Sequence, residues 1–234
     1  MMKQLQGLLY FYAADLRFSF TVFWSVLLSF LGVSLIIAYL LLNVDGAKFL
    51  FGFPVGAYGY AGIIGFLMVK EYIPYSLKFG AVRKNIYLAI GLFFLAFSFF
   101  MAILSSTFQS LAVAFIDAID LHIMHIIHPA LIIGNDTWLT RIVMDTAIMF
   151  TIAVVLFVIG LLLYRGGLIT GSSVVGLLLL FLLFGVAQGF LFEYLQELYH
   201  SIRMMYFFQV FAFGIVLFAF CYIFVKGITT VKKR

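Results

Sequence analysis

The sequence predicts an all-α membrane protein, and three observations lead to that prediction: the composition, the length of the uncharged tracts and the distribution of charge. The 234 residues are 66% hydrophobic and only 10% charged, with a mean hydropathy of +1.22. Soluble domains are roughly 45–50% apolar and about 25% charged, so this chain has too few charges to give several helices a water-facing surface. A soluble globular domain and a large aqueous catalytic domain are therefore excluded.

Six tracts without Asp, Glu, Lys or Arg approach or exceed the roughly 20 apolar residues that a spanning helix needs. Backbone groups in hydrocarbon must be satisfied within the element, which leaves helices or a closed barrel. Barrel strands alternate apolar and polar residues, and the continuous apolar run at 93–97 does not. We therefore expect one domain with six transmembrane helices at about 18–44, 49–69, 85–116, 139–164, 166–192 and 204–226.

The charges of the connecting segments predict the orientation. If both termini are cytoplasmic, eleven of the 14 basic residues lie on the inner side and seven of the nine acidic residues lie on or near the outer side. This distribution obeys the positive-inside rule. Lys3, Asp15 and Arg17 precede the first long apolar run, so no cleavable signal peptide is expected.

The segment before the first span, residues 1–17, is predicted to be an amphipathic helix on the inner membrane surface. Its apolar residues recur at helical spacing, whereas its charged residues fall elsewhere. A poorly ordered tail is the alternative. The apolar positions are Leu5, Leu8, Leu9, Tyr12 and Leu16.

Glycines are concentrated in the second and fifth spans. Small residues allow helices to approach closely, so we expect packing contacts within one protomer. A contact between subunits, or a hinge or substrate path along the second span, remains an alternative. The glycines are Gly52, Gly56, Gly59, Gly62 and Gly65 in the second span and Gly185 and Gly189 in the fifth.

The connection at 70–85 is the largest basic segment on the inner side, and it is not a simple polar linker. Between its basic residues stand apolar and aromatic side chains that are costly to expose. We expect them to be buried against the membrane surface or a cytoplasmic partner. These side chains are Ile73, Tyr75, Leu77, Phe79 and Val82.

On the outer side, residues 116–128 are predicted to form an amphipathic interfacial helix that Pro129 ends. Its polar face would carry His122, His125 and His128 beside two aspartates. This face is either simply hydrated or a divalent-metal site, because imidazole and carboxylate are metal ligands. In the next span, Arg141 and Asp145 are spaced i, i+4 and are expected to form an ion pair.

Several nucleotide-binding and hydrolase motifs are absent from the sequence. The chain has no G-x-x-x-x-G-K-[ST] phosphate loop, no G-x-S-x-G elbow and no H-E-x-x-H pair. We expect no catalytic residues and no ATP site on this chain.

The span layout and the stretch from Ile73 to Asn85, with its proline and its Gly80-Ala81-Val82-Arg83-Lys84 tail, resemble the small bacterial ABC exporter permeases of the type V fold. The aromatic spans are most similar to Firmicute permeases of peptide and toxin export, such as phenol-soluble-modulin exporters. The resemblance implies a bacterial plasma-membrane subunit that forms a homodimer or pairs with a paralogous permease.

The same resemblance implies a cytoplasmic ABC ATPase partner that carries the ATP and Mg, and contacts with membrane lipids. The net charge of +5 is explained by membrane orientation, so we expect no contact with nucleic acid. The first helix would be a connecting helix, and spans two and five would line the dimer interface and the translocation path. Lys78, Arg83 and Lys84 would flank the ATPase contact or bind lipid phosphates. The residues implied to enter the ATPase groove are Glu71, Tyr72, Ile73, Pro74, Tyr75 and Ser76.

Two other function classes remain open. One is a membrane metalloenzyme that uses His122, His125 and His128. The other is a non-transporting membrane subunit, such as an immunity or sensor protein.

Overall fold

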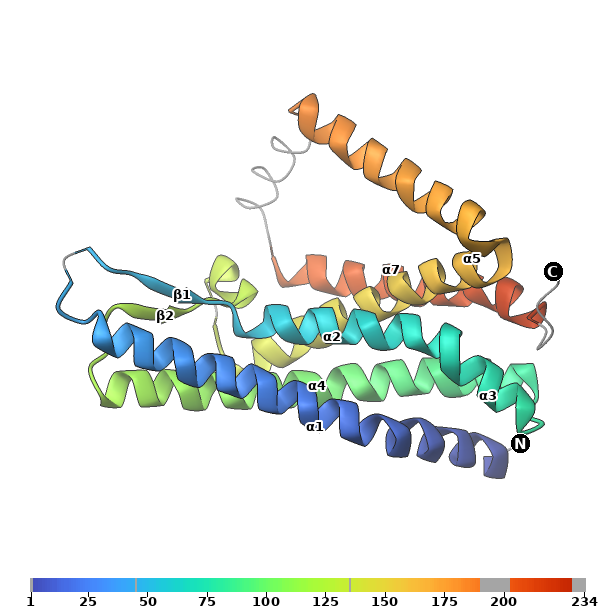
Figure 1. The fold of residues 1–234 in the computed structure, drawn as a ribbon, viewed down its shortest axis with the longest axis horizontal. Coiled ribbons are helices and arrows are strands. Elements are labelled where there is room, and N and C mark those ends of the chain that lie inside the picture. The colour runs from blue at the N-terminus through green and yellow to red at the C-terminus, as the bar shows by residue number, and fades with distance from the viewer. Residues whose placement is uncertain (1, 45, 135, 190–202, 229–234) are drawn as a thin grey trace.

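The structure is a computed structural model that describes residues 2–44, 46–134, 136–189 and 203–228. Its backbone is helical apart from two three-residue strands and the connections between elements (Figure 1). The elements are α1 (Met2–Leu40), β1 (Phe49–Phe51), α2 (Phe53–Leu67), the π-helical turn η1 (Met68–Tyr72), α3 (Ile73–Lys78), α4 (Arg83–Ala118), β2 (Met124–Ile126), the 3-10 turn η2 (Pro129–Ile133), α5 (Trp138–Ala187) and α7 (Met204–Lys226).

Within these residues, five helices have the length and hydropathy to cross a membrane, which confirms the all-α, membrane-compatible character. They are Met2–Leu40, Phe53–Lys78, Arg83–Ala118, Trp138–Gly167 and Met204–Lys226. The sixth predicted span, 166–192, corresponds to the far part of α5, and its last residues lie outside the described ranges. A count of six spans therefore stays a prediction.

The helix α5 contains a break at Gly167, whose φ of 72° and ψ of −179° are not helical. A positive φ of this size favours glycine because it has no Cβ. Beyond this residue the helix leaves the bundle at an angle (Figure 1). Just before the break, the guanidinium of Arg165 lies 5.7 Å from the ring centre of Phe224 and so links α5 to the end of α7.

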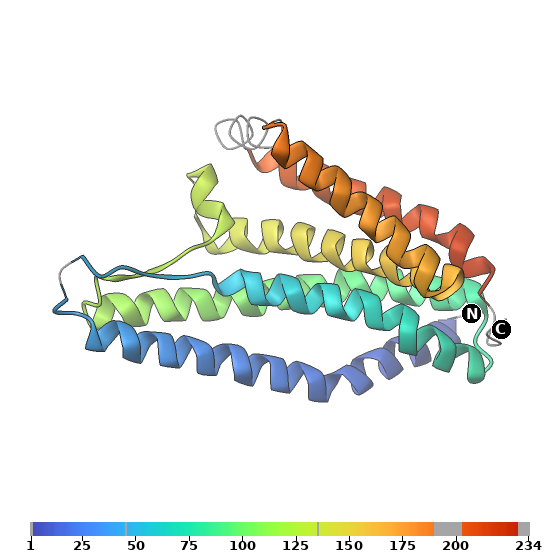
Figure 2. The same cartoon turned by 45° about the horizontal axis from the view of Figure 1, so that its top comes forward.

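The predicted amphipathic helix at 1–17 is not a separate element. It is the first part of α1, which continues without interruption to Leu40 and bends along its length (Figure 2). The run Ala13-Ala14-Asp15-Leu16-Arg17 contains neither Gly nor Pro, so nothing in it ends the helix. Its apolar face, with Leu8, Tyr12 and Leu16, is buried against the rest of the protein. A position on the membrane surface stays a prediction.

The connection at 70–85 is mostly helical. The span Phe53–Lys78 is one 26-residue run in which α2 passes through η1 into α3. A π-helical turn inserts an extra residue without ending the helix, and Pro74 falls in the first turn of α3, where its missing N–H is tolerated. Gly80, with φ +75°, then reverses the chain into α4.

The prediction of an outer helix at 116–128 is wrong. Helix α4 ends at Ala118, and β2 pairs in parallel with β1, with Phe49 opposite Met124 and Phe51 opposite Ile126. Within β2, Met124 is buried and His125 is exposed, as expected for neighbouring residues of a strand. The partner strand lies far away in the sequence, so local helical periodicity gave no sign of it.

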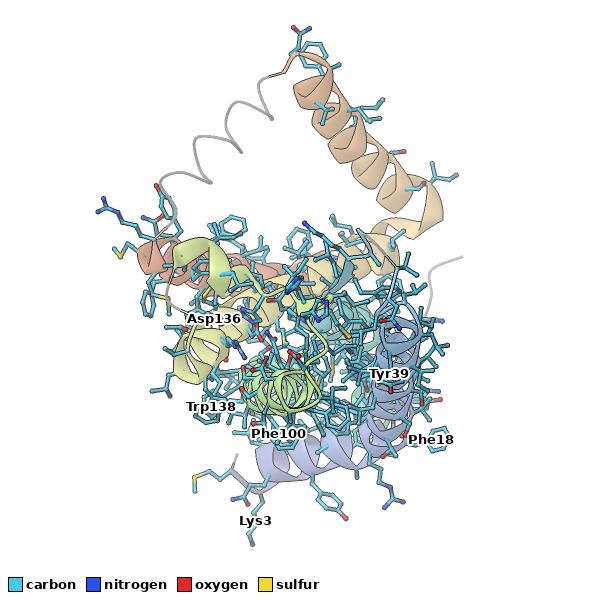
Figure 3. All side chains as sticks on the ribbon, turned by 90° about the vertical axis from the view of Figure 1, so that its left-hand side faces the viewer. Lys3, Phe18, Tyr39, Phe100, Asp136 and Trp138 are labelled. Atoms are coloured by element: carbon cyan, nitrogen blue, oxygen red, sulfur yellow. The ribbon has the colours of Figure 1, made fainter. Side chains whose placement is uncertain are left out.

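The two ends of the bundle carry different elements. The N-terminal end of α1, the short helix α3, the break in α5 and the end of α7 lie at one end, which we call the α3 end (Figure 1). The strands β1 and β2 lie at the other, the sheet end. On the outside of α1, Phe18 and Tyr39 point away from the bundle (Figure 3).

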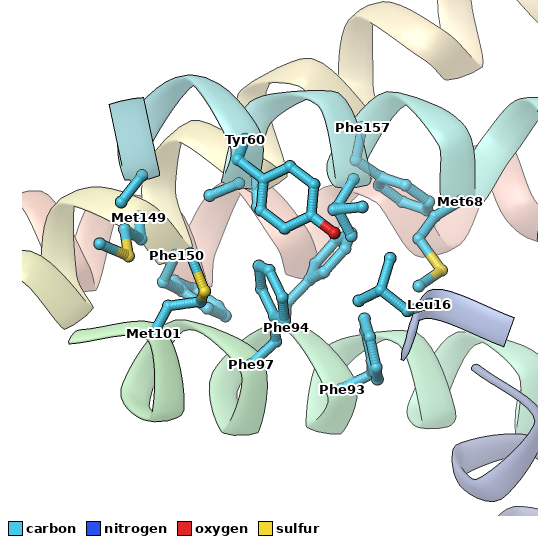
Figure 4. Packing of buried hydrophobic residues seen from close by; sticks show 14 of the residues in the cluster. Leu16, Tyr60, Met68, Phe93, Phe94, Phe97, Met101, Met149, Phe150 and Phe157 are labelled. Carbon is cyan, nitrogen blue, oxygen red and sulfur yellow. The ribbon is translucent and has the colours of Figure 1, made fainter. Parts of the chain in front are cut away.

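The core between the helices is rich in aromatic side chains. Phe94 of α4 meets Phe157 of α5 edge-on, with ring centres 5.6 Å apart, and both are fully buried. Phe93 stacks on Phe97, and Phe97 lies against Tyr60 of α2 (Figure 4). Such pairs add to the stability that burial of the rings already supplies.

Candidate functional site

At the α3 end, residues 70–84 form a projection that we call the α3 knob. The helical period gives it two faces. Tyr72, Ile73 and Ser76 are buried in the protein, with exposed fractions of 4%, 1% and 0%. On the opposite face, Glu71 and Tyr75 are exposed. The buried face therefore anchors the knob, and the other face is free to meet another molecule.

The first part of α1 holds the buried face of the knob. The hydroxyl of Tyr12 lies 3.1 Å from the hydroxyl of Ser76, and both side chains are fully buried. The rings of Tyr12 and Tyr72 meet edge-on with centres 5.5 Å apart, and Phe11 meets Phe79 in the same way at 5.8 Å. These contacts join two segments that are far apart in the sequence.

One side chain, Gln4, fixes the turn that follows α3. Its amide nitrogen donates to the carbonyl of Gly80 at 3.4 Å. Its carbonyl oxygen accepts from the backbone N–H of Val82 at 3.5 Å and from the side-chain amide of Asn85. Because one amide meets both sides of the turn, the start of α1 and the start of α4 are tied to the knob.

The tip of the knob is apolar with a basic rim. Tyr75, Phe79 and Val82 are 50%, 73% and 58% exposed. The ammonium of Lys78 lies 5.4 Å from the ring centre of Tyr75, within the range of a cation–π contact. The guanidinium of Arg83 donates to the carbonyl of Ile228 at 2.9 Å and so connects the rim to the end of α7.

The six residues predicted to enter an ATPase groove therefore divide into two sets. Glu71 and Tyr75 are exposed and Pro74 is half-buried, so these three are accessible. Tyr72, Ile73 and Ser76 face the protein interior and support the knob from within. The predicted flanking residues Lys78, Arg83 and Lys84 are all exposed.

Some of the predicted packing glycines lie close to another helix, and others do not. A Cβ at Gly56 would lie 3.1 Å from Leu27 of α1, and one at Gly62 would lie 3.2 Å from Ile152 of α5. At Gly65 it would overlap the backbone carbonyl of Ala153. The tightest approach between α2 and α5 is therefore at Gly65.

At three of the remaining predicted glycines, Gly52, Gly59 and Gly189, a Cβ would meet no other helix among the described residues. A Cβ at Gly52 would meet only Val55 of its own helix. A Cβ at Gly59 or Gly189 would have no atom of another described residue within 4 Å, and Gly189 has a φ of +77°. Gly185 lies in the part of α5 beyond the break. A translocation path along these glycines stays a prediction.

At the sheet end, a buried polar cluster joins three elements. Asp145 of α5 accepts a hydrogen bond from the hydroxyl of Tyr58 at 2.5 Å, and His128 Nε2 lies 3.1 Å from the same oxygen, Oδ1. His128 and Asp145 are both fully buried. The other ring nitrogen of His128, Nδ1, accepts from the backbone N–H of Ala130 at 2.9 Å.

This cluster corrects the predicted ion pair between Arg141 and Asp145. Arg141 instead binds Asp136, with one nitrogen on each carboxylate oxygen. Asp136 lies beside the start of α5 (Figure 3), where Thr137 caps the helix. The i, i+4 spacing alone favoured Asp145, but the loop before the helix supplies a nearer carboxylate.

The three histidines proposed as metal ligands do not come together. His122 and His125 are exposed, and His128 is buried against Asp145. Across the described residues, no group of three or more His, Cys, Asp or Glu side chains has a geometry that would hold a metal ion. The single-face arrangement required a helix at 116–128, which does not form.

The cluster of Tyr58, His128 and Asp145 was not predicted from the sequence. Its members lie 17 and 87 positions apart, so no local spacing reveals them. One signal was present: Asp145 is an acid at the edge of a long apolar tract, and such residues usually have a partner or a function.

Comparison of the chain with protein-family models, curated proteins and solved structures finds no match.

Proposed function

We propose that this chain is the membrane-spanning permease subunit of an ATP-driven ABC exporter in a bacterial plasma membrane. The cargo class we propose is hydrophobic or amphipathic peptides or drug-like molecules. The observation that supports the proposal best is the α3 knob: an exposed apolar tip, Tyr75, Phe79 and Val82, on a base that α1 holds in place.

The anchoring of the knob suits a coupling role. A partner can shift a conformational equilibrium only if its contacts differ between the two states. If the knob moved independently of the bundle, its contacts with the partner would not depend on the conformation of the spanning helices. Here Tyr12 and Gln4 connect it to α1, and Gln4 also accepts a hydrogen bond from Asn85 of α4. The knob continues directly into α4 at Arg83, so a displacement of the knob acts on two spanning helices at once.

The charge at the α3 end supports a cytoplasmic position for the knob. Its rim carries Lys70, Lys78, Arg83 and Lys84, and Arg165 lies close to the end of α7. The positive-inside rule places such a surface in the cytoplasm, where an ATPase would meet it. We propose both termini on this side.

The proposed partners follow from this arrangement. A cytoplasmic ABC ATPase would supply the ATP and Mg site, because the chain has no phosphate loop. A second copy or a paralogous permease would complete the transport unit, with α2 and α5 lining the interface and path. The exposed apolar faces of α1 and α7 would meet lipid.

Two variants and one control test the proposal. The tagged chain is purified with any ATPase that accompanies it, and ATP hydrolysis is measured with and without transport substrate in vesicles. We expect Tyr75→Ala or Pro74→Ala to abolish transport-linked stimulation while the melting temperature, Tm, of the chain stays unchanged. Tyr39→Ala is the matched control, because Tyr39 is also an exposed tyrosine of the same bundle but lies at the sheet end.

Unchanged stimulation in both variants, or purification without any ATPase, would refute the coupling role. A non-transporting immunity or sensor subunit would still bind a partner through the knob, but it would show no substrate-stimulated hydrolysis. The metalloenzyme alternative required His122, His125 and His128 on one face of a helix, and these side chains do not come together.

A further inference from the structure

The interior of the sheet end contains oxygen atoms that no described residue hydrogen-bonds. They belong to four side chains, each no more than 1% exposed: Asp145 of α5 and Ser105, Ser106 and Gln109 of α4. The atoms are Oδ2 of the aspartate, the two serine hydroxyls and Oε1 of the glutamine. We call these four side chains the Asp145 site. Buried polar groups are normally hydrogen-bonded, and each one left without a partner costs about 1–3 kcal/mol.

Two contacts fix the level of these residues along the bundle. Arg141 of α5 lies 3.4 Å from the hydroxyl of Ser110 on α4, and Phe157 meets Phe94 nearer the α3 end. The two helices are therefore antiparallel, and equal steps along each place Ser106 at the height of Asp145. Ser105 and Gln109 belong to the same and the next turn of α4.

The hydrogen bonds of His128 determine the charge of this region. Its Nδ1 accepts from the N–H of Ala130, so Nδ1 carries no proton. The single ring proton is then on Nε2, which donates to Asp145 Oδ1, and the imidazole is neutral. Tyr58 donates to the same oxygen as a neutral hydroxyl.

No cation among the described residues balances the carboxylate. Arg141, the basic residue one turn away on α5, has its guanidinium on both oxygens of Asp136. An ionised Asp145 therefore gives this interior one net negative charge. A buried charge without a counter-charge is expensive in a low-dielectric interior.

We propose that the Asp145 site binds a monovalent metal cation of the sodium class. Side-chain oxygens are the ligands that hard cations prefer. One carboxylate balances one positive charge, which favours a monovalent ion over Ca²⁺ or Mg²⁺. Full burial of all four side chains favours a bare ion over the larger ammonium group of a cargo molecule. The inference stands apart from the proposed coupling to an ATPase, since it concerns the chain by itself.

The test measures sodium binding to the purified full chain in detergent micelles near neutral pH. Sodium chloride is exchanged for N-methyl-D-glucamine chloride at constant total salt, with potassium chloride as a further arm. We expect Tm to rise by about 5–10 °C when sodium reaches about 100 times its Kd. Radioactive sodium should bind at about one ion per chain.

Three variants assign the effect to the site. Asp145→Asn and Ser106→Ala should lose the sodium-dependent rise in Tm and most of the bound sodium. Asp117→Asn is the matched control for removal of a carboxylate, because Asp117 is exposed near the end of α4, and it should behave as wild type. If Asp145→Asn yields no folded protein, Gln109→Ala makes the same test with the carboxylate retained.

Two results would overturn the proposal. A wild-type chain with the same Tm in sodium and N-methyl-D-glucamine, and no bound sodium, would mean that a proton on Asp145 or water satisfies these oxygens. A sodium response that survives unchanged in Ser106→Ala and Gln109→Ala would place the ion elsewhere.

Discussion

The two ends of the bundle place their charged side chains in different ways, and the buried residues of helix α4 also change along its length. Between its start at the α3 end and its middle, the buried residues of α4 include three aromatic rings, Phe93, Phe94 and Phe97. Toward the sheet end the buried residues include small or polar side chains, Ser105, Ser106 and Gln109. At the α3 end the charges lie outside, whereas at the sheet end a carboxylate lies inside.

This difference suits different tasks. Large rings fill space and fix the relative positions of helices, so the α3 end can hold a knob in a defined place. Small polar side chains fill less space, and when buried they need hydrogen-bond partners or a ligand. The sheet end therefore suits recognition of an ion or of polar groups. In one bundle, the stacked rings of the core and the buried carboxylate thus lie at different levels along the helix axis.

The largest expected effect is on the contact that spans the boundary between the two ends, where α2 meets α5 at Gly65. Gly65→Ala places a Cβ on the backbone carbonyl of Ala153, and backbone cannot turn aside as a flexible side chain can. We expect a loss of about 3 kcal/mol from this overpacking, measured by thermal unfolding in detergent.

Gly59→Ala is the matched control on the same helix, because no described neighbour lies within 4 Å of its Cβ position. It should be neutral or slightly stabilising, since Ala favours helix over Gly. Equal losses in both variants would mean that α2 and α5 do not approach most closely at Gly65.

An intermediate effect is expected from Tyr58→Phe at the sheet end. The variant keeps the ring but removes a hydroxyl that donates to a buried carboxylate at 2.5 Å. Hydrogen bonds to charged groups contribute about 1.5–3 kcal/mol, so we expect a loss of about 2 kcal/mol in thermal unfolding.

The comparison is with Tyr60→Phe on the same helix. The hydroxyl of Tyr60 donates to the neutral hydroxyl of Ser19 at 3.2 Å, and its loss should cost about 1 kcal/mol or less. If the two variants lose the same stability, Asp145 is not a charged acceptor and the contrast between the two ends weakens.

The smallest effect on stability is expected from Gln4→Ala at the α3 end, although it acts directly on the knob. Two of the three hydrogen bonds around the turn are exposed and the one to Asn85 is partly buried, so their loss should cost about 1 kcal/mol. Hydrogen exchange of the amides at 79–85 should become several-fold faster.

Gln6→Ala is the control, since Gln6 is an exposed residue of the same turn of α1. It should leave exchange at 79–85 unchanged. Exchange that is equally slow in both variants would mean that α1 does not hold the knob.

Some elements of the fold were accessible from local pattern. The long tracts without charge gave helices close to α2, α4 and α7, because a spanning helix satisfies its backbone within itself and leaves a continuous apolar run. The periodic apolar positions of 1–17 also gave a helix with one buried face. Two spans were predicted at 139–164 and 166–192, and the structure has one element, α5, with a break at Gly167.

Other elements depended on residues far away in the sequence. Strand β2 exists because β1 lies beside it, and its short apolar run fitted a helix equally well when considered alone. The burial of Tyr72 and Ser76 in the segment 68–78 depended on α1, whose Tyr12 contacts both side chains. In the candidate site, the packing of the segment against the rest of the protein decided which of the six side chains at 71–76 are buried and which are exposed. The local sequence did not show this division.

By itself, then, the sequence determined the helical class, the presence of helices apolar enough to cross a membrane, and the sign of the charge on each connecting segment. These follow from composition and from the free energy of placing charges and backbone in lipid. Only the tertiary structure decided which partner each polar side chain has. Asp145 meets Tyr58 and His128 rather than Arg141 because the three elements that carry them converge at the sheet end. The energy of a buried charge depends on that convergence, and local spacing does not describe it.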